Sequence, residues 1–329
     1  MRIAFITTVL NEEKNILLLL KSVASQSRRP DEIIIVDGGS KDNTVQIIEN
    51  WISKIRSENL KDRIKVLVKK GNRSLGRNEA ISRAFNLPVI KITNCEIIAC
   101  SDSGCILDKN WIRNITKPFK RKDVDVVAGY YKGLAKSVFE KSLLPYVLVM
   151  PDKVKADKFL PAARSMAFRK NIWEKAGSFP QALSSNEDFV FARKLKRIGA
   201  KVVFKKNAFV YFMPRENISE AFLMFFKFAK GDAEASILRP KVIFILIRYI
   251  ILFWLLIYVY FFKLFFILET IFYILVVYIL WSIWKNYRYV KDREAFLFLP
   301  LIQITSDVAV ITGTSWGFLK GLWDTQKKR

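Results

Sequence analysis

The chain has 329 residues, of which 51% are hydrophobic, and its 55 Lys and Arg residues outnumber its 30 Asp and Glu residues. The net charge of +25 fits a negatively charged partner, either the headgroups of a membrane or a nucleic acid. The chain has no histidine, so metal binding and acid/base chemistry fall mostly on carboxylates.

The first two-thirds of the chain alternate between short apolar runs and amphipathic segments. This alternation predicts an α/β domain over residues 1–217, with a mostly parallel sheet and flanking helices. Strands are expected at residues 2–8, 32–36, 64–68, 97–100, 125–127, 166–168, 201–204 and 208–212, and the longer helices at 42–54, 74–85 and 187–198. Ligands of such sheets bind at the carboxyl ends of strands, where Asp37 and Asp102 fall.

Residues 134–160 are expected to be irregular, with Pro145, Pro151 and an apolar run at 143–150. This stretch suits a mobile acceptor loop or a segment that dips into the surface of a bilayer.

Two features predict that the α/β domain stays in the cytosol. The chain enters a strand-like run at once, without the long apolar stretch of a signal peptide. Its three cysteines, Cys95, Cys100 and Cys105, match no metal or redox spacing, so they are expected to be small packing residues in a reducing compartment.

The last third of the chain has the composition of a membrane region. Residues 218–240 carry aromatic side chains at helical spacing beside Lys227 and Lys230, which favours an amphipathic helix at the membrane surface. A helix packed on the α/β domain is the alternative. Within residues 241–329, the stretches 242–262 and 264–284 are long enough to cross a bilayer, and 295–319 is a third apolar segment.

Basic residues constrain the topology of this region. The cluster Lys285, Arg288, Lys291 and Arg293 is expected to face the cytosol, as the C-terminal Lys327-Lys328-Arg329 also is. Both conditions favour a third segment that is re-entrant or interfacial, with a true span as the alternative. We therefore expect a multi-pass protein of the cell membrane whose α/β domain faces the cytosol, with the bilayer and not nucleic acid as its partner.

Two motifs near the N-terminus carry a family resemblance. The run Thr7-Thr8-Val9-Leu10-Asn11-Glu12-Glu13 is followed by Ile34-Ile35-Val36-Asp37-Gly38-Gly39-Ser40-Lys41-Asp42-Asn43-Thr44. Together they resemble the start of the family 2 glycosyltransferases, which have the GT-A fold and move a sugar from a nucleotide to an acceptor. The resemblance implies that Thr7, Val9, Glu12 and Asp37 line a nucleotide pocket. The alternative is a tight turn at Asp37 and a helix cap at Asp42.

A third motif, Gly76-Arg77-Asn78-Glu79-Ala80, keeps part of the residue order of the family's Gly-x-x-x-Ala-Arg-Asn segment. The resemblance places Arg77 at the diphosphate or base side of the pocket. A surface arginine with an exposed salt bridge is the alternative.

The run Ser101-Asp102-Ser103-Gly104-Cys105 stands where the family has its Asp-x-Asp motif. That motif holds a divalent cation against phosphate oxygens. Asp102 matches the first aspartate, and Gly104 stands at the second. The resemblance implies that Ser101 and Asp102 bind the nucleotide sugar and that Asp102 binds Mg²⁺ or Mn²⁺, with fewer protein ligands than usual. A strand-terminating turn is the alternative.

The run Asn186-Glu187-Asp188 resembles the family's Glu-Asp pair at the start of a helix. It implies that Asp188 is the general base of an inverting transfer and that Glu187 positions or caps. Charge complementarity at a helix N-terminus is the alternative. By a weaker resemblance, Arg215 meets the leaving diphosphate.

The resemblance covers residues 1–240 and implies a membrane-tethered enzyme that transfers one sugar with inversion. The donor is expected to be a UDP- or GDP-linked sugar, and the acceptor a lipid, a lipid-linked glycan or another glycan. No Gln-x-x-Arg-Trp motif follows Asp188, which argues against a processive synthase. The alternatives are a nucleotidyltransferase that acts on sugar phosphates and a catalytically silent relative in the membrane.

Overall fold

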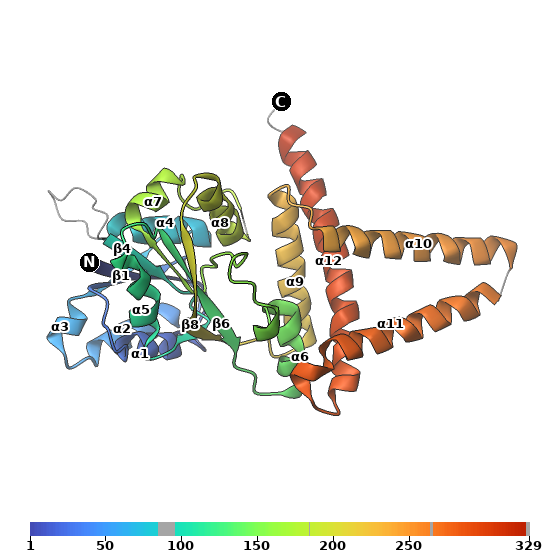
Figure 1. Cartoon of the computed structure of the whole chain (residues 1–329), viewed down its shortest axis with the longest axis horizontal. Coiled ribbons are helices and arrows are strands. Elements are labelled where there is room, and N and C mark those ends of the chain that lie inside the picture. The colour runs from blue at the N-terminus through green and yellow to red at the C-terminus, as the bar shows by residue number, and fades with distance from the viewer. Residues whose placement is uncertain (85–95, 184, 264–265, 327–329) are drawn as a thin grey trace. The chain divides into compact units, whose positions relative to one another are not determined.

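The computed structural model describes residues 1–84, 96–183, 185–263 and 266–326. The chain separates into two compact units (Figure 1). The first contains Met1–Leu134 and Met150–Met213, and the second contains Ala135–Val149 and Pro214–Arg329. Cys95 lies outside the described residues, while Cys100 and Cys105 are free and buried thiols, as their predicted packing role requires.

The first unit is built on one mixed sheet with the strand order β3-β2-β1-β4-β7-β6-β8-β5. Strands β1 to β4 pair in parallel, β7 is antiparallel to both β4 and β6, β6 and β8 are parallel, and β5 is antiparallel to β8. The bounds are β1 Arg2–Val9, β2 Glu32–Asp37, β3 Ile64–Val68, β4 Glu96–Cys100, β5 Cys105–Leu107, β6 Val126–Gly133, β7 Met166–Arg169 and β8 Val202–Phe212. The predicted strands at 201–204 and 208–212 are one strand, whose register against β6 shifts between Gly129 and Tyr130.

Helices cover both faces of this sheet (Figure 1). Their bounds are α1 Ile16–Ala24, α2 Thr44–Ser53, α3 Glu58–Lys61, α4 Arg73–Arg83, α5 Trp111–Thr116, α7 Lys170–Lys175 and α8 Glu187–Arg197, with short 3-10 turns at Lys117–Lys120 and Pro151–Lys153. Alternate residues of the central strands enter two different cores: Phe5 and Ile35 join one, and Ile6 and Ile34 join the other. Burial on both faces explains why these strands read as continuous apolar runs.

The second unit is helical. Its helices are α6 Val138–Val147, α9 Ile218–Glu234, α10 Pro240–Phe262, α11 Phe266–Val290 and α12 Ala295–Gln326. The prediction that residues 134–160 are irregular is wrong for α6, which begins at a cap where the Ser137 hydroxyl accepts a hydrogen bond from the Glu140 amide at 3.2 Å.

Helices α9 and α12 lie side by side, with backbones in close approach (Figure 1). A Cβ atom added at Gly313 would lie 2.5 Å from the Phe226 carbonyl oxygen, and one at Gly317 would lie 2.7 Å from the Lys230 carbonyl oxygen. Only glycine permits this spacing. The predicted amphipathic helix therefore has α12 as a packing partner, a contact that its sequence pattern does not reveal.

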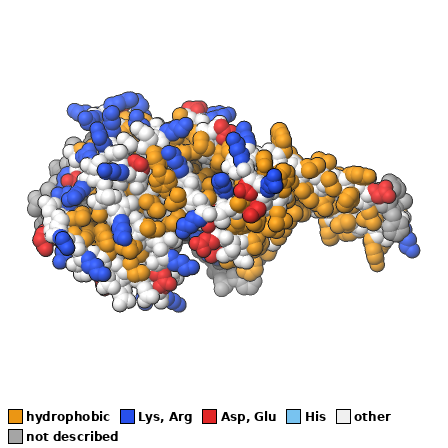
Figure 2. Space-filling model, turned by 90° about the horizontal axis from the view of Figure 1, so that it is seen from below, with side chains coloured by type: hydrophobic (Ala, Val, Ile, Leu, Met, Phe, Trp, Pro, Cys, Tyr) orange, Lys and Arg blue, Asp and Glu red, His pale blue; other side chains and the backbone are white. Residues whose placement is uncertain are grey.

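Helices α10, α11 and α12 are each long and apolar enough to cross a membrane, with mean hydropathies of 2.7, 2.0 and 1.8. Figure 2 shows hydrophobic side chains over most of the α10–α11 hairpin. Residues such as Phe244 and Trp284 are exposed by 73% and 79%, an arrangement that suits lipid contact. α12 is one continuous helix, so the described residues contain no re-entrant turn there, and the interfacial and spanning alternatives remain predictions.

Candidate active site

Asp37 ends β2 and closes the turn that follows it. Its Oδ1 atom accepts hydrogen bonds from the amides of Gly39 and Ser40, both at 2.8 Å, and its Oδ2 atom accepts one from the Ser40 hydroxyl at 2.5 Å. The side chain is buried, and Gly39 has a φ of +94°, which glycine adopts without strain. Asp37 therefore holds the loop in shape, as the tight-turn alternative requires, and a nucleotide would have to share its oxygens.

The two N-terminal motifs are joined by hydrogen bonds. The Asn11 amide donates to the Ser40 hydroxyl at 2.9 Å, and the Glu12 amide donates to the Thr44 hydroxyl at 2.8 Å. Burial raises the pKa of Asp42, but hydrogen bonds led by that from the Thr44 hydroxyl outweigh it and hold this pKa below its usual range. The loops after β1 and β2 therefore form one structured edge of the sheet.

Thr7 and Val9 lie in β1 and are buried. The Thr7 hydroxyl has no hydrogen-bond partner among the described residues. Since buried hydroxyls normally find a partner, this group is available to a ligand that reaches the strand. Contact between a nucleotide and these two side chains remains a prediction.

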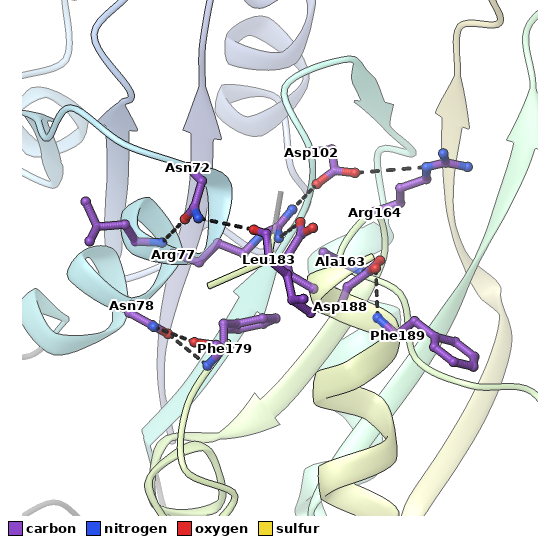
Figure 3. A network of polar contacts seen from close by, with 12 residues as sticks. Asn72, Arg77, Asn78, Asp102, Ala163, Arg164, Phe179, Leu183, Asp188 and Phe189 are labelled. Carbon is purple, nitrogen blue, oxygen red and sulfur yellow. Dashed lines mark hydrogen bonds and ion pairs between the residues drawn. The ribbon is translucent and has the colours of Figure 1, made fainter. Parts of the chain in front are cut away.

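Arg77 joins two motifs that are far apart in the sequence (Figure 3). Its side chain is 2% exposed and donates from Nη1 to Glu187 Oε1 at 2.5 Å and from Nη2 to Asp102 Oδ1 at 2.7 Å. Burial lowers the pKa of Arg77, but the charges of Asp102 and Glu187 outweigh it and raise this pKa above its usual value. The alternative of an exposed surface arginine is therefore wrong. The contact of Arg77 with a diphosphate or base remains a prediction, and its partners within the chain are carboxylates.

The same helix anchors the segment that precedes α8. The Asn72 side chain donates to the Gln181 and Leu183 carbonyls at 2.6 and 3.1 Å, and the Asn78 side chain exchanges two hydrogen bonds with the backbone of Phe179 (Figure 3). α4 therefore determines where α8 begins, and with it the positions of Glu187 and Asp188.

Asp102 follows β4 and lies between two arginines (Figure 3). Its Oδ1 atom accepts the bond from Arg77, and its Oδ2 atom lies 3.9 Å from Nε of Arg164. Burial raises the pKa of Asp102, while the charges of Arg77, Arg73 and Arg164 outweigh it and hold that pKa below its usual range. Asp102 is therefore an anionic group at neutral pH. The preceding Ser101 donates its hydroxyl to the Arg164 carbonyl at 2.9 Å.

Asp188 occupies the first turn of α8, after Asn186, whose φ of 58° is left-handed. Its Oδ2 atom accepts from the Ala163 amide at 3.1 Å, and its Oδ1 atom accepts from the Phe189 amide at 2.8 Å (Figure 3). Burial and the charge of Glu187 raise the pKa of this half-buried carboxyl above its usual value. A raised pKa suits a group that takes up a proton near neutral pH. Charge complementarity at the helix start holds as well, since both acids lie in the first turn.

The side chains near Asp102 offer a divalent cation few ligands. Gly104 contributes no side chain, and both Asp102 oxygens face arginines. Among the described residues, no three His, Cys, Asp or Glu side chains gather in a way that could hold a metal ion. These residues do not fit a cation held by the protein alone.

Arg215 is exposed and belongs to the second unit, so its predicted contact with a diphosphate remains a prediction. Arg164 and Tyr131 lie near the charged cluster although no sequence pattern indicates them: Arg164 approaches Asp102, and its Cζ atom lies 5.7 Å from the centre of the Tyr131 ring. Neither belongs to a recognisable motif, and only the fold brings them to Asp102.

Comparison with known proteins supports the family resemblance. Residues 4–161 match the model of the glycosyl transferase family 2. An O-antigen chain rhamnosyltransferase, RfbN, of Salmonella typhimurium is 25% identical over 62% of this chain and 65% of its own length. The glycosyltransferase GlyG of Streptococcus pneumoniae is 28% identical over 39% of this chain and 38% of its own length. The chain thus spans less than two-thirds of the length of either relative.

A solved structure shares the fold. The mannosyltransferase PcManGT from Pyrobaculum calidifontis, in complex with GDP-Man and Mn²⁺, aligns with a TM-score of 0.50 over 70% of this chain and 62% of that chain, at 15% identity. At this identity the likeness concerns the fold alone, and it confirms the α/β architecture of the GT-A type that the sequence predicts.

Proposed function

We propose, on the premise that this chain belongs to glycosyl transferase family 2 through its residues 4–161, that it transfers a sugar from a nucleotide donor to an acceptor hydroxyl with inversion. The observation that carries the proposal is the convergence on Arg77 of Asp102, from the end of β4, and Glu187, from the start of α8. This contact supports the proposal, because it joins the residues expected to bind the nucleotide sugar to the acids expected to act on the acceptor.

In this proposal Asp188 is the general base. The acceptor hydroxyl attacks the anomeric carbon, Asp188 takes its proton, and the bond from that carbon to the phosphate oxygen breaks, so that the nucleoside diphosphate leaves with the electron pair. The raised pKa of Asp188 supports this role, since a base is most effective when its pKa is near the working pH. Arg77 holds Glu187 and Asp102 in place and acts through them.

The donor is proposed to be UDP- or GDP-linked and to lie at the carboxyl ends of β1, β2 and β4. The motif residues Thr7, Val9, Glu12, Asp37, Ser101 and Asp102 come from those strands or the loops after them. A divalent cation, Mg²⁺ or Mn²⁺, remains a prediction, and the mannosyltransferase of the same fold binds Mn²⁺ together with its donor. Asp102 is the carboxylate that would hold it here, with phosphate oxygens and water as further ligands.

The acceptor is proposed to be a lipid or a lipid-linked glycan. Three apolar helices of spanning length support a membrane location, and a site tethered to a bilayer meets lipid-linked substrates at high local concentration. A cytosolic orientation of the catalytic unit remains a prediction from the basic cluster at Lys285 to Arg293.

The proposal is tested by release of nucleoside diphosphate from a panel of UDP- and GDP-linked sugars, including deoxyhexoses because a relative is a rhamnosyltransferase. The full chain is purified in detergent and compared with Asp188→Asn and with Asp62→Asn, which alters an exposed carboxyl outside the site. We expect release by the parent and the control but not by Asp188→Asn. Donor binding without release in any of the three would overturn the catalytic role, and the absence of donor binding would favour a silent relative.

A further inference from the structure

Arg164 is held in the site by its backbone. The loop before β7 is bonded on both sides of this residue: the Ala163 amide donates to Asp188 at 3.1 Å, and the Arg164 carbonyl accepts from the Ser101 hydroxyl at 2.9 Å. The next residue, Ser165, is fully buried and accepts a hydrogen bond from Trp111 Nε1 at 2.8 Å. The loop that carries Arg164 is therefore tied to Asp188, the proposed base, and to Ser101, which precedes Asp102, and the Arg164 side chain lies beside Asp102 (Figure 3).

The guanidinium of Arg164 is held in a fixed orientation by two aromatic rings, and its N–H donors are open. Its Cζ atom lies 4.2 Å from the centre of the Phe212 ring and 5.7 Å from that of Tyr131, distances at which a cation is attracted to a ring face. Its Nε atom lies 3.9 Å from Asp102 Oδ2, which is beyond hydrogen-bond range. Among the described residues, no acceptor takes a hydrogen bond from its N–H groups, although the side chain is only 19% exposed.

The positive charge of Arg164 is only partly compensated by the carboxylates of the cluster. Arg77 is shared between Glu187 and Asp102 and has no further charge to offer a ligand. Asp102 accepts the hydrogen bond from Arg77 at its Oδ1 atom, and among the described residues it is the one carboxylate that forms an ion pair with Arg164. A half-buried guanidinium with open N–H donors and a counter-ion at 3.9 Å favours an anionic ligand with two oxygens in one plane, and the fork of arginine matches a phosphate group in this way.

Gly104 shows that crowding does not explain the missing second carboxylate. A Cβ atom built there would meet nothing within 4 Å, so an aspartate would fit. Position 104 thus has room for a second carboxylate and carries none, while an arginine with open donors lies beside Asp102. A cationic side chain can take over part of the charge compensation that a cation held by two aspartates would supply.

We propose that Arg164 binds the diphosphate of the donor nucleotide. Its guanidinium neutralises part of the diphosphate charge, because a cation held by the single carboxylate Asp102 is bound more weakly than one held by two aspartates. The inference rests on the proposed function, because it takes the donor to be a nucleoside diphosphate sugar. It adds Arg164 to the residues that contact the donor, with Phe212 and Tyr131 as the rings that set the plane of its guanidinium.

The test measures binding of UDP, UMP, GDP and GMP to the full chain in detergent by calorimetry, with EDTA and then with Mn²⁺. For the base that the parent binds, we expect Arg164→Gln to weaken diphosphate binding in EDTA by about tenfold or more, which is the range of a hydrogen bond to a charged group. Monophosphate binding should change less. Arg164→Lys should recover part of the loss, because it keeps the charge and lacks the fork. Arg83→Gln, on the exposed surface of α4, is the matched control.

Two results would overturn the inference. The first is diphosphate binding by Arg164→Gln that equals the parent in EDTA. The second is an equal loss for mono- and diphosphate together with a lowered unfolding temperature, which would mean that Arg164 only supports the loop. Failure of the parent to bind UDP or GDP would overturn the proposed function itself, and the inference with it.

One double variant tests whether a carboxylate at position 104 with Mn²⁺ can replace the guanidinium of Arg164. The double variant Gly104→Asp with Arg164→Gln restores a second carboxylate where space is open and removes the guanidinium. We expect it to regain diphosphate binding only when Mn²⁺ is present. Recovery in EDTA, or no gain with Mn²⁺ in a variant that unfolds at the parent's temperature, would contradict a compensating role for Arg164.

Discussion

Arg77 on α4 donates a hydrogen bond to Glu187 on α8 at 2.5 Å, although the two residues are 110 positions apart in the chain. Both side chains are almost fully buried, and the second end of the guanidinium holds Asp102. A buried charge is tolerated only when it is paired, so this contact ties the folding of the first unit to the assembly of its candidate site.

Replacement of Arg77 should therefore destabilise the first unit and abolish activity together. Arg77→Met leaves Glu187 buried without a counter-ion, and breaking a buried pair in this way costs about 3–5 kcal/mol. We expect a lower midpoint of thermal unfolding, and partial recovery of the midpoint, but not of activity, in Arg77→Met with Glu187→Leu. Arg83→Met, whose partner Glu79 is on the surface, is the control. An unchanged midpoint in Arg77→Met would refute the structural part of this assignment.

The raised pKa of Asp188 predicts how the rate of transfer depends on pH. Its pKa is raised by burial and by Glu187, so the base is protonated as the pH falls through a value above the ordinary aspartate pKa of about 3.9. We expect the rate at limiting donor to fall on the acid side with an apparent pKa above that value. Asp102, whose pKa is lowered mainly by Arg77 against the effect of burial, stays ionised over the same range. A rate that is flat down to the ordinary aspartate pKa would speak against Asp188 as the base.

The raised pKa of Asp188 also predicts how the stability of the folded chain changes with pH. A carboxyl whose folded pKa is raised binds its proton more tightly in the folded state, so its charge disfavours the folded state at neutral pH and this effect disappears as the pH falls. The unfolding temperature of the parent should therefore improve relative to Asp188→Asn as the pH is lowered from neutral through the raised pKa. Parallel pH curves for the two chains would show that the carboxyl is not perturbed.

Asp102 is the residue through which a divalent cation would act on the donor. We expect Asp102→Ala to remove the part of nucleoside diphosphate binding that EDTA abolishes in the parent, because Asp102 is the residue to which the proposed function assigns the cation. Calorimetry with and without the chelator measures this part directly. If the chelator has the same effect on Asp102→Ala as on the parent, the cation is held elsewhere.

The strands and motif positions of the first unit follow from local patterns, and most of its contacts do not. Apolar runs that end in Asp37 and Asp102 predict parallel strands with a site at their carboxyl ends, and β1, β2 and β4 confirm this arrangement. By contrast, the burial of Arg77 and the approach of Arg164 to Asp102 depend on where α8 and the loop before β7 lie. Those positions are set by long-range hydrogen bonds such as that from Asn78 to Phe179, which leave no periodic signal.

The start of helix α6 carries a capping signal in its sequence. Ser137 and Glu140 have the spacing of a capping box, and the Ser137 hydroxyl and the Glu140 carboxylate both accept hydrogen bonds from backbone amides at the helix start. Pro145, which predicts irregular structure, lies inside the helix. Pro145 lacks an amide and so removes one i→i−4 hydrogen bond, but it lies near the C-terminal end of α6, which ends at Val147.

Asp307 on α12 is fully buried and accepts a hydrogen bond from Arg248 of α10 at 2.5 Å, while Tyr278 of α11 also donates to it. The Asp307 carboxylate on α12 therefore links α10, through Arg248, and α11, through Tyr278. An arginine in an apolar span without its counter-ion is costly, so Asp307→Leu should lower the unfolding temperature in detergent.

The double variant Arg248→Leu with Asp307→Leu tests whether the ion pair adds to the stability of the helices or only avoids the cost of a single unpaired charge. Removing both charges avoids the unpaired arginine, and replacing a buried pair by apolar residues is often neutral. We therefore expect the double variant to unfold at a higher temperature than Asp307→Leu alone, while Lys263→Leu at the end of α10 leaves the midpoint unchanged. A double variant as unstable as Asp307→Leu would mean that the hydroxyls and the Gln303 amide around Asp307, rather than Arg248, hold the three helices together.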